Sequence, residues 1–146
     1  MSIKFRDMLP EDAFIISELE KRLFGTCTDA ASYKKMCLEE ESIYMVAEDN
    51  GTVIAYCAIT ALYETADLCN IAVKNEYRCC HIAKKLLEKC IMRCKGKGVT
   101  RILLEARESN APAINFYKKM GFMEIGKRRD YYKEPCEDAV IMEKIL

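Results

Sequence analysis

The feature that most constrains this chain is a pair of strand-like segments that meet at an Asn-Gly turn. Residues 42–48 and 52–62 are rich in apolar, aromatic and β-branched side chains, and Asp49-Asn50-Gly51 separates them. Asn-Gly between two apolar runs is the strongest short-range signal for a hairpin, because both residues tolerate the positive φ angles of a tight turn. We expect two antiparallel strands here, and residues 67–73 should add a third strand to the meander.

Helical and strand patterns flank this meander on both sides. A strand at 3–6 precedes a helix that opens at Pro10-Glu11-Asp12 and carries Phe14, Ile15, Leu19 and Leu23. A second helix follows Asp29 and should run to Glu40, with Glu39-Glu40-Glu41 as a solvated end. The longest apolar stripe predicts a helix that ends at Gly96 and Gly98, and comprises Ile82, Ala83, Leu86, Leu87, Cys90, Ile91 and Cys94.

The C-terminal third alternates between strands and one short helix. Residues 101–106 form a buried strand, and Asn110 caps a helix that ends at Gly121. Residues 122–128 and 139–145 supply the last two strands. The order βααβββαβαββ, in 146 residues without a repeat or linker, predicts one α/β domain whose sheet has helices on both faces.

Charge and hydropathy exclude several classes of protein. The 23 basic side chains equal the 23 acidic ones, whereas binding nucleic acid through its phosphates requires a basic field. No apolar stretch follows the first charged residues, and the longest apolar run, 53–63, is too short to span a bilayer as a helix. We expect a cytoplasmic protein without membrane or nucleic-acid contacts.

The nine cysteines are expected to be reduced thiols rather than metal ligands. Without a secretory signal, an odd number of cysteines favours the reduced state. Cys79-Cys80-His81 is a dense group, but the sequence has no Cys-x-x-Cys or His-x3-His pair. We therefore predict no metal site.

The most informative segment is a strand that leads through a short turn into the long helix. Asn70-Ile71-Ala72-Val73 ends the meander, and Arg78-Cys79-Cys80-His81-Ile82-Ala83 opens the helix. Such a turn directs free backbone N–H groups outward, where they can bind a pyrophosphate. Most strand-to-helix turns only meet water, so the spacing alone leaves both interpretations open.

Two side chains further along the chain have a polar group in an apolar context. Glu105 interrupts the buried strand 101–106, so its carboxylate must be solvated, paired or functional; Arg107 is the obvious ion-pair partner. Tyr117 lies among apolar neighbours, where tyrosine is most often a core residue. Arg128-Arg129-Asp130-Tyr131-Tyr132 combines cations with aromatics, which fits either a peptide-binding turn or an exposed charged one.

With these residues assembled, the chain resembles the GNAT superfamily of acyl-CoA N-acyltransferases, and within it the ribosomal-protein alanine N-acetyltransferases. The similarity rests on five segments in order: Asn70-Ile71-Ala72-Val73, residues 104–110, Ala113-Ile114-Asn115-Phe116-Tyr117 with Met120-Gly121-Phe122, residues 128–132 and residues 137–142. The resemblance implies a mixed, mostly antiparallel sheet whose splayed strands bind acetyl-CoA.

The resemblance also implies where the co-substrate acetyl-CoA binds. The pantetheine arm would lie along Ile71, Ala72 and Val73, and the pyrophosphate would bind the turn formed by Arg78, Cys79, Cys80, His81, Ile82, Ala83 and Lys84. Asn110 and Tyr117 would contact the co-substrate too. His81 stands where the family's phosphate turn usually has its first glycine, while Ala83 keeps the second small residue. Affinity is therefore expected to be reduced or pH-dependent.

The implied chemistry is direct acetyl transfer to an amine, without an acyl-enzyme. The glutamate matching Glu105 takes the proton from the amine, and the tyrosine matching Tyr117 protonates the CoA thiolate. The acceptor would be a protein or peptide N-terminus, the terminal alanine of a small-subunit ribosomal protein by this resemblance, positioned by Arg128, Tyr131 and Tyr132. Residues 23–28 depart from the relatives' acceptor segment. Another amine, or a non-catalytic acyl-CoA-binding module, are the alternatives.

Overall fold

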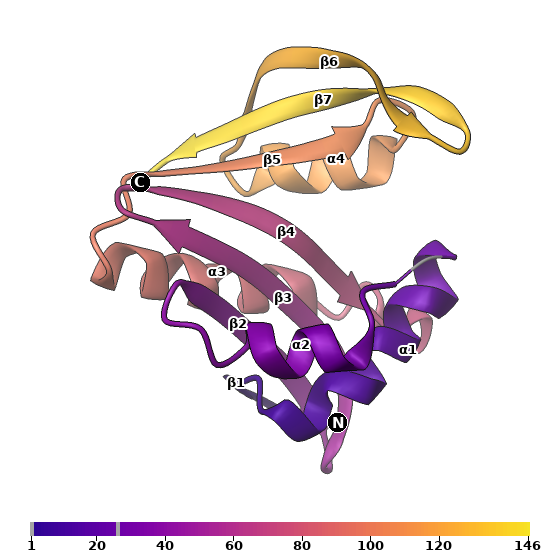
Figure 1. The fold of residues 1–146 in the computed structure, drawn as a ribbon, viewed down its shortest axis with the longest axis vertical. Coiled ribbons are helices and arrows are strands. Elements are labelled where there is room, and N and C mark those ends of the chain that lie inside the picture. The colour runs from indigo at the N-terminus through magenta and orange to yellow at the C-terminus, as the bar shows by residue number, and fades with distance from the viewer. Residues whose placement is uncertain (1, 26) are drawn as a thin grey trace.

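The computed structural model describes residues 2–25 and 27–146, which form a seven-stranded sheet with helices on both faces (Figure 1). The strands are β1 (Ile3–Asp7), β2 (Ser42–Asp49), β3 (Thr52–Leu62), β4 (Thr65–Val73), β5 (Arg101–Arg107), β6 (Met123–Lys133) and β7 (Cys136–Ile145). The helices are α1 (Ala13–Phe24), α2 (Ala30–Met36), α3 (Ile82–Gly96) and α4 (Ala111–Lys119), with 3₁₀ turns at Pro10–Asp12 and Asn75–Tyr77. The predicted element order and the α/β class are confirmed.

The sheet has the strand order β1-β2-β3-β4-β5-β7-β6, and only β4 and β5 are parallel neighbours. The Asn-Gly hairpin is confirmed, since Asn50 and Gly51 have φ angles of 49° and 85°. β4 and β5 pair only over residues 65–67 and 101–103, whereas β5 stays paired with β7 over all of residues 101–107. The sheet therefore divides between β4 and β5 (Figure 1).

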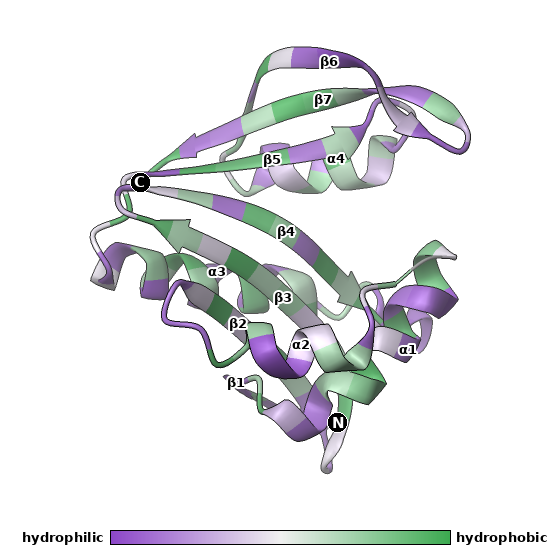
Figure 2. Cartoon of the chain, in the orientation of Figure 1, coloured by the Kyte–Doolittle hydropathy of each residue, from purple (hydrophilic) through white to green (hydrophobic). Residues whose placement is uncertain are grey.

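Each face of the sheet has its own hydrophobic core. α3 and α4 cover one face, where α3 buries Leu86, Leu87 and Cys90 against β2 to β5. α1 and α2 cover the other face, where Ile16 and Leu19 pack against β2 and β3. Figure 2 shows hydrophobic and hydrophilic residues mixed along each helix, as expected for helices with one buried face. The stripe predicted for α3 is confirmed.

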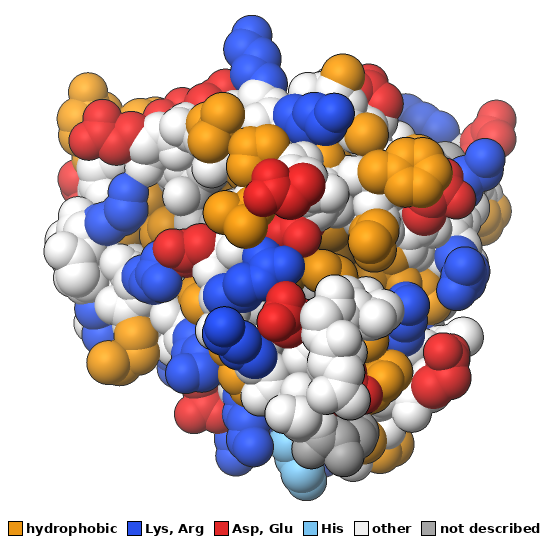
Figure 3. Space-filling view, turned by 90° about the horizontal axis from the view of Figure 1, so that it is seen from below, with side chains coloured by type: hydrophobic (Ala, Val, Ile, Leu, Met, Phe, Trp, Pro, Cys, Tyr) orange, Lys and Arg blue, Asp and Glu red, His pale blue; other side chains and the backbone are white. Residues whose placement is uncertain are grey.

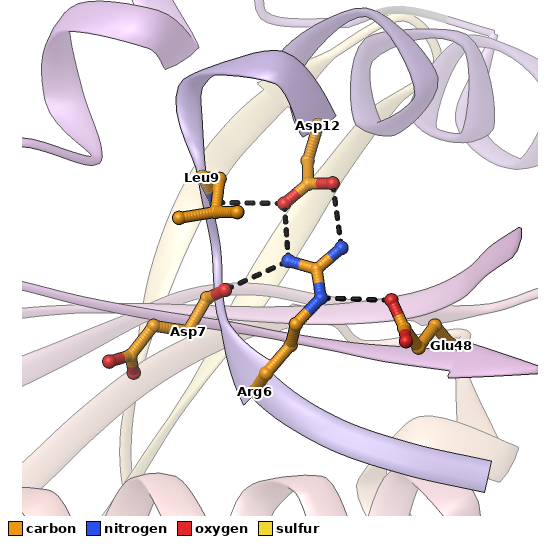
Figure 4. A network of polar contacts seen from close by, with 5 residues as sticks. All are labelled: Arg6, Asp7, Leu9, Asp12 and Glu48. Atoms are coloured by element: carbon orange, nitrogen blue, oxygen red, sulfur yellow. Dashed lines mark hydrogen bonds and ion pairs between the residues drawn. The ribbon is translucent and has the colours of Figure 1, made fainter. Parts of the chain in front are cut away.

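A partly buried cluster around Arg6 fixes the start of α1 to the edge of the sheet (Figure 4). Arg6 of β1 donates to Asp12 from Nη1 and Nη2 at 2.7 and 2.9 Å, and to Glu48 from Nε at 2.9 Å. Burial alone would raise the pKa of Asp12, but the Arg6 guanidinium and the Leu9 N–H outweigh it and lower the pKa below its usual value. The cluster anchors α1 against β1 and β2.

The sequence-based prediction for the N-terminal helices is wrong in two places. The pattern puts Phe14 and Ile15 on the apolar face of α1, but they are 65% and 40% exposed, because the buried face passes through Ala13, Ile16 and Leu19. The second helix is expected to reach Glu40, whereas α2 ends at Met36. There the Ser42 hydroxyl donates to the Met36 carbonyl at 2.6 Å, so the chain turns back into β2 and leaves the acidic residues 39–41 exposed.

Three strand boundaries also differ from the prediction. β4 begins at Thr65 rather than Asp67, β6 continues to Lys133 rather than ending at 128, and β7 begins at Cys136 rather than Ala139. Residues 128–132 therefore lie within β6 and not in a turn after it. They form an irregular stretch in which Asp130 has a φ of 50° and its N–H donates to Asp138 at 2.9 Å.

The surface carries side chains of both charges, as the charge balance of the sequence predicts. On the face shown in Figure 3, basic and acidic side chains are interspersed with apolar ones. Within residues 2–25 and 27–146, no helix is long and apolar enough to cross a membrane. The nine cysteines lie as free thiols, of which Cys57, Cys90 and Cys94 are buried.

Candidate active site

The division of the sheet leaves backbone groups of β4 without a strand partner. The Lys74 N–H donates to the Ile54 carbonyl of β3 at 2.9 Å, which fixes the direction of alternate groups along β4. The N–H groups of Ile71 and Val73 must therefore face the other way, toward the gap between β4 and β5, where the Ile71 N–H donates to the Asn70 side-chain oxygen at 3.0 Å. An extended ligand chain can pair with such an exposed edge as an additional strand would.

A cavity of about 730 Å³ opens along this edge. Its wall is formed by the end of β4, the turn before α3 and one side of α4, with Leu23 and Phe24 of α1 at its border. Every residue predicted to bind the co-substrate lines it except Cys80: Ile71, Ala72, Val73, Arg78, Cys79, His81, Ile82, Ala83, Lys84, Asn110 and Tyr117. The sulfur of Cys80 instead lies 3.6 Å from the Arg78 carbonyl, and its side chain packs on the core.

The turn before α3 has the backbone geometry of an anion site. Cys79 and His81 both have left-handed conformations, with φ angles of 63° and 59°. His81 is the N-cap of α3 and its side chain makes no capping hydrogen bond, so the first N–H groups of this 15-residue helix have no side-chain acceptor at the cap. Arg78 and Lys84 supply positive charge at the same end of the cavity. These groups fit the pyrophosphate of a CoA thioester.

Tyr117 lies on α4 and lines the cavity. Its ring packs against Phe116 and Phe122, with centroids 5.5 and 5.8 Å away. Burial raises the pKa of Tyr117 well above its ordinary value, and the neighbouring Cys57 thiol acts in the same direction. The hydroxyl is therefore protonated throughout the neutral range and can donate a proton within the cavity.

Glu105 lies on the other face of the sheet from α4. Ile102, Leu104 and Ala106 of β5 are buried in the core under α3 and α4, and strand alternation turns Glu105 away from it. Its side chain is 31% exposed, and Oε1 is 3.7 Å from the Arg128 Nε of β6. Glu105 is thus open to an incoming cationic or amine group on the side away from Tyr117.

Aromatic and basic side chains of β6 surround this carboxylate. The Glu105 carboxylate lies beside the Tyr131 hydroxyl and raises the pKa of Tyr131, and burial adds to the effect. Burial is the main cause that raises the pKa of Tyr132, and the negative charge of Glu105 adds to it. The guanidinium carbon of Arg128 lies 5.8 Å from the centre of the Tyr131 ring. Glu105 is therefore brought together with all three predicted acceptor-binding residues, Arg128, Tyr131 and Tyr132.

The sequence suggests Arg107 as the ion-pair partner of Glu105, and that assignment is wrong. Arg107 Nη1 instead lies 3.2 Å from Glu137 Oε1 and donates to the Pro135 carbonyl at 3.0 Å. Its guanidinium also stacks over the Tyr132 ring at 4.3 Å. Arg107 therefore contacts the end of the β6–β7 hairpin, and Arg128 of the same hairpin lies beside Glu105.

Several further residues near the cavity are not identified by the sequence patterns. Tyr77, Pro112, Ala113, Phe116, Lys119 and Met120 line it as well. The helical spacing of Ala113, Phe116, Tyr117 and Met120 could have identified this face of α4. Of the acceptor segment 23–28, Thr26 lies outside the described residues. Among the residues described, no group of three or more His, Cys, Asp or Glu side chains could hold a metal ion.

A divided sheet, an anion-binding turn and a protonated tyrosine define the class of protein. The acetyltransferase (GNAT) family matches residues 9–122 of the chain. The chain belongs to the GNAT acetyltransferase family. It is an N-acetyltransferase, and acetyl-CoA is the acetyl donor of this family.

Particular relatives narrow the comparison. A Bacillus subtilis protein, provisionally assigned as a ribosomal protein bS18-alanine N-acetyltransferase, is 36% identical over 138 residues, covering 94% of this chain and 91% of the relative. The Haemophilus influenzae ribosomal protein bS18-alanine N-acetyltransferase is 38% identical over 97 residues, 64% of this chain and 66% of that protein. The crystal structure of the Escherichia coli ribosomal-protein-S18-alanine N-acetyltransferase has a TM-score of 0.89 and 28% identity, covering 99% of this chain and 94% of that one.

Proposed function

We propose that this chain transfers the acetyl group of acetyl-CoA directly to the α-amine of an N-terminal alanine, on a small-subunit ribosomal protein. The relatives that share most of its length are named for this reaction, which supports the assignment of acceptor. We further propose that residues 1–146 act as a single acetyltransferase domain in the cytoplasm.

One observation carries the proposal: Glu105 and Tyr117 belong to opposite faces of the sheet at its division. Glu105 accepts the proton of the acceptor amine on the face with Arg128, Tyr131 and Tyr132. Tyr117, kept protonated by burial, donates to the departing thiolate on the cavity side. Donor and acceptor would thus occupy separate regions, and no residue needs to carry the acyl group.

An α-amine suits a carboxylate base of this kind. A protein α-amine has an ordinary pKa of about 7.7–8.0, whereas that of lysine is about 10.4. A substantial share of an α-amine is therefore already neutral near pH 7.5. A partly exposed carboxylate is a sufficient base for the rest, so an N-terminus is favoured over a lysine side chain.

A peptide panel tests the acceptor. Synthetic peptides that differ only in the first residue, Ala, Ser, Gly or Met, are incubated with acetyl-CoA, and free thiol is measured. The control is the Ala peptide with its α-amine blocked and one internal lysine. Fast release with the Ala peptide and none with the control is expected. Faster thiol release with the blocked peptide would replace the proposed acceptor with a lysine. Thiol release with none of the peptides would replace it with a small-molecule amine.

A further inference from the structure

A second carboxylate, Glu20 of α1, is buried directly behind the donor edge of β4. It is 4% exposed, and four groups donate to it. Oε2 accepts from the hydroxyls of Tyr33 and Tyr56, both at 2.6 Å, and from Asn70 Nδ2 at 2.9 Å. Oε1 accepts from the Thr28 N–H at 3.0 Å. A buried carboxylate is costly unless its oxygens are satisfied, so this set of donors fixes its position.

Glu20 determines which way the Asn70 carboxamide points. A carboxylate only accepts hydrogen bonds, so the Asn70 NH2 group must face Glu20. The Asn70 oxygen Oδ1 then faces the backbone, where it accepts from the Ile71 N–H at 3.0 Å. The reverse orientation would set the NH2 group against the Ile71 N–H and the amide oxygen against the Glu20 carboxylate. Glu20, Asn70 and Ile71 thus form a chain of hydrogen bonds that ends at the gap between β4 and β5.

The tyrosines keep this chain in one state. Burial raises the pKa of Tyr33 and of Tyr56 far above the ordinary value, and Glu20 adds to the effect for both. Both hydroxyls therefore stay protonated and donate to Oε2. The Thr28 N–H holds the other oxygen, and the Ser17 hydroxyl donates to the Thr28 carbonyl at 2.6 Å. Glu20 has one arrangement in which all its partners are satisfied.

We propose that Glu20 is a positioning residue for the acyl donor: it orients Asn70, whose bond to the Ile71 N–H fixes the backbone of β4 at the cavity edge where the donor binds. The inference rests on the proposed function in one respect, the binding of acetyl-CoA along Ile71. Glu20 itself touches no cavity atom and takes no proton in the reaction.

Exchanging the charge between two positions tests this directly. In the Asn70→Asp variant two carboxylates face each other, and their repulsion displaces the carboxylate at position 70 from the Ile71 N–H. In the double variant Glu20→Gln/Asn70→Asp the amide and the carboxylate have changed places. The new amide at position 20 then donates to the new carboxylate at position 70, which accepts from the Ile71 N–H. The matched control is Glu18→Gln/Asn70→Asp. It has the same net charge as the first double variant, and Glu18 is an exposed residue of the same helix. Asn70→Leu removes the link without adding charge.

The measurement is the Kd for acetyl-CoA by calorimetry at pH 8 without an acceptor, together with the Tm of each variant. Asn70→Asp and Asn70→Leu are expected to raise Kd about tenfold, because the unanchored backbone at residue 71 must then be ordered when the donor binds. Glu20→Gln/Asn70→Asp should recover most of this loss, and the Glu18 control should not. Tyr33→Phe should lower Tm but leave Kd within about twofold, because it does not touch Asn70.

Two outcomes would overturn the inference. One is an unchanged Kd in both folded Asn70 variants; the other is equal recovery in the Glu18 control, which would reduce the effect to net charge. Failure of the wild-type chain to bind acetyl-CoA would instead contradict the proposed function. The two failures are therefore distinguishable.

Discussion

The donor cavity and the acceptor face differ in the chemical groups that form them. The donor cavity is formed by backbone N–H groups, a turn with two left-handed residues and a largely apolar wall. The acceptor face consists of charged and aromatic side chains: Glu105, Arg128, Tyr131 and Tyr132. A backbone site binds one ligand shared by a whole family, whereas side chains on a partly exposed face can change with the acceptor. The following variants should therefore affect one region and spare the other.

The largest effect is expected for Tyr117→Phe on the donor side. Loss of the proton donor should lower kcat about 10²–10³-fold while the acetyl-CoA Kd stays within about threefold, because a general acid acts mainly in the transition state. The matched control is Tyr77→Phe, which removes a hydroxyl from the same cavity wall that is committed to Asp49 at 2.6 Å. Equal activity of the two variants would remove Tyr117 from the proton transfer.

Glu105→Gln should have the next largest effect and should act on the acceptor side. We expect kcat/KM for the peptide to fall about 10²-fold at pH 7. The loss should shrink toward pH 8.5, since more of the α-amine is then neutral without a base. Glu88→Gln, an exposed change on α3, serves as the control for charge. A loss that is independent of pH would contradict the role of a base.

His81→Gly sharpens the account of the donor turn. Glycine adopts the φ of 59° without steric cost, so we expect a gain of about 0.5–1 kcal/mol in stability and an acetyl-CoA Kd lowered about fivefold. Tyr63→Gly relieves the same torsion, a φ of 59°, at an exposed hairpin tip outside the cavity. It should raise stability alone. Weaker binding in His81→Gly would show that the imidazole itself contacts the ligand.

Arg128→Met should have the smallest effect. The Arg128–Glu105 pair is 3.7 Å long and the arginine side chain is 59% exposed, so it contributes little to stability. We expect the KM for the peptide to rise about threefold with the acetyl-CoA Kd unchanged. An equal change in the acetyl-CoA Kd, measured by calorimetry, would mean that the two regions are not separate.

The same difference explains what could be predicted from the sequence. The hairpin at Asn50-Gly51, the stripe of α3 and the cap at Asn110 depend on local patterns, and all three are present in the structure. The donor cavity follows from such elements, because its groups belong to the backbone of β4 and the turn before α3. Local patterns located the strand, turn and helix of that region, whereas its assignment as the acetyl-CoA site came from the resemblance to the GNAT superfamily.

Long-range side-chain pairing was not predictable in the same way. The exchange of Arg107 for Arg128 as the partner of Glu105 depends on the length of the β6–β7 hairpin, which extends five residues beyond the predicted end of β6, from 128 to 133. Glu20 stands four residues after Ile16 on the buried face of α1, but the sequence pattern placed Phe14 and Ile15 on that face, so the burial of Glu20 was not predicted. Its partners come from α2, β3 and β4, and no local pattern indicates them.

In the proposed reaction, donor and acceptor occupy separate regions at the same time, and acetyl passes directly between them. Initial velocities measured over a grid of acetyl-CoA and Ala-peptide concentrations test it most directly. Double-reciprocal lines that intersect are expected, as a ternary complex requires. Parallel lines, together with a stable acetylated enzyme detected by mass spectrometry in the absence of peptide, would show that a residue of the chain carries the acetyl group and would contradict direct transfer.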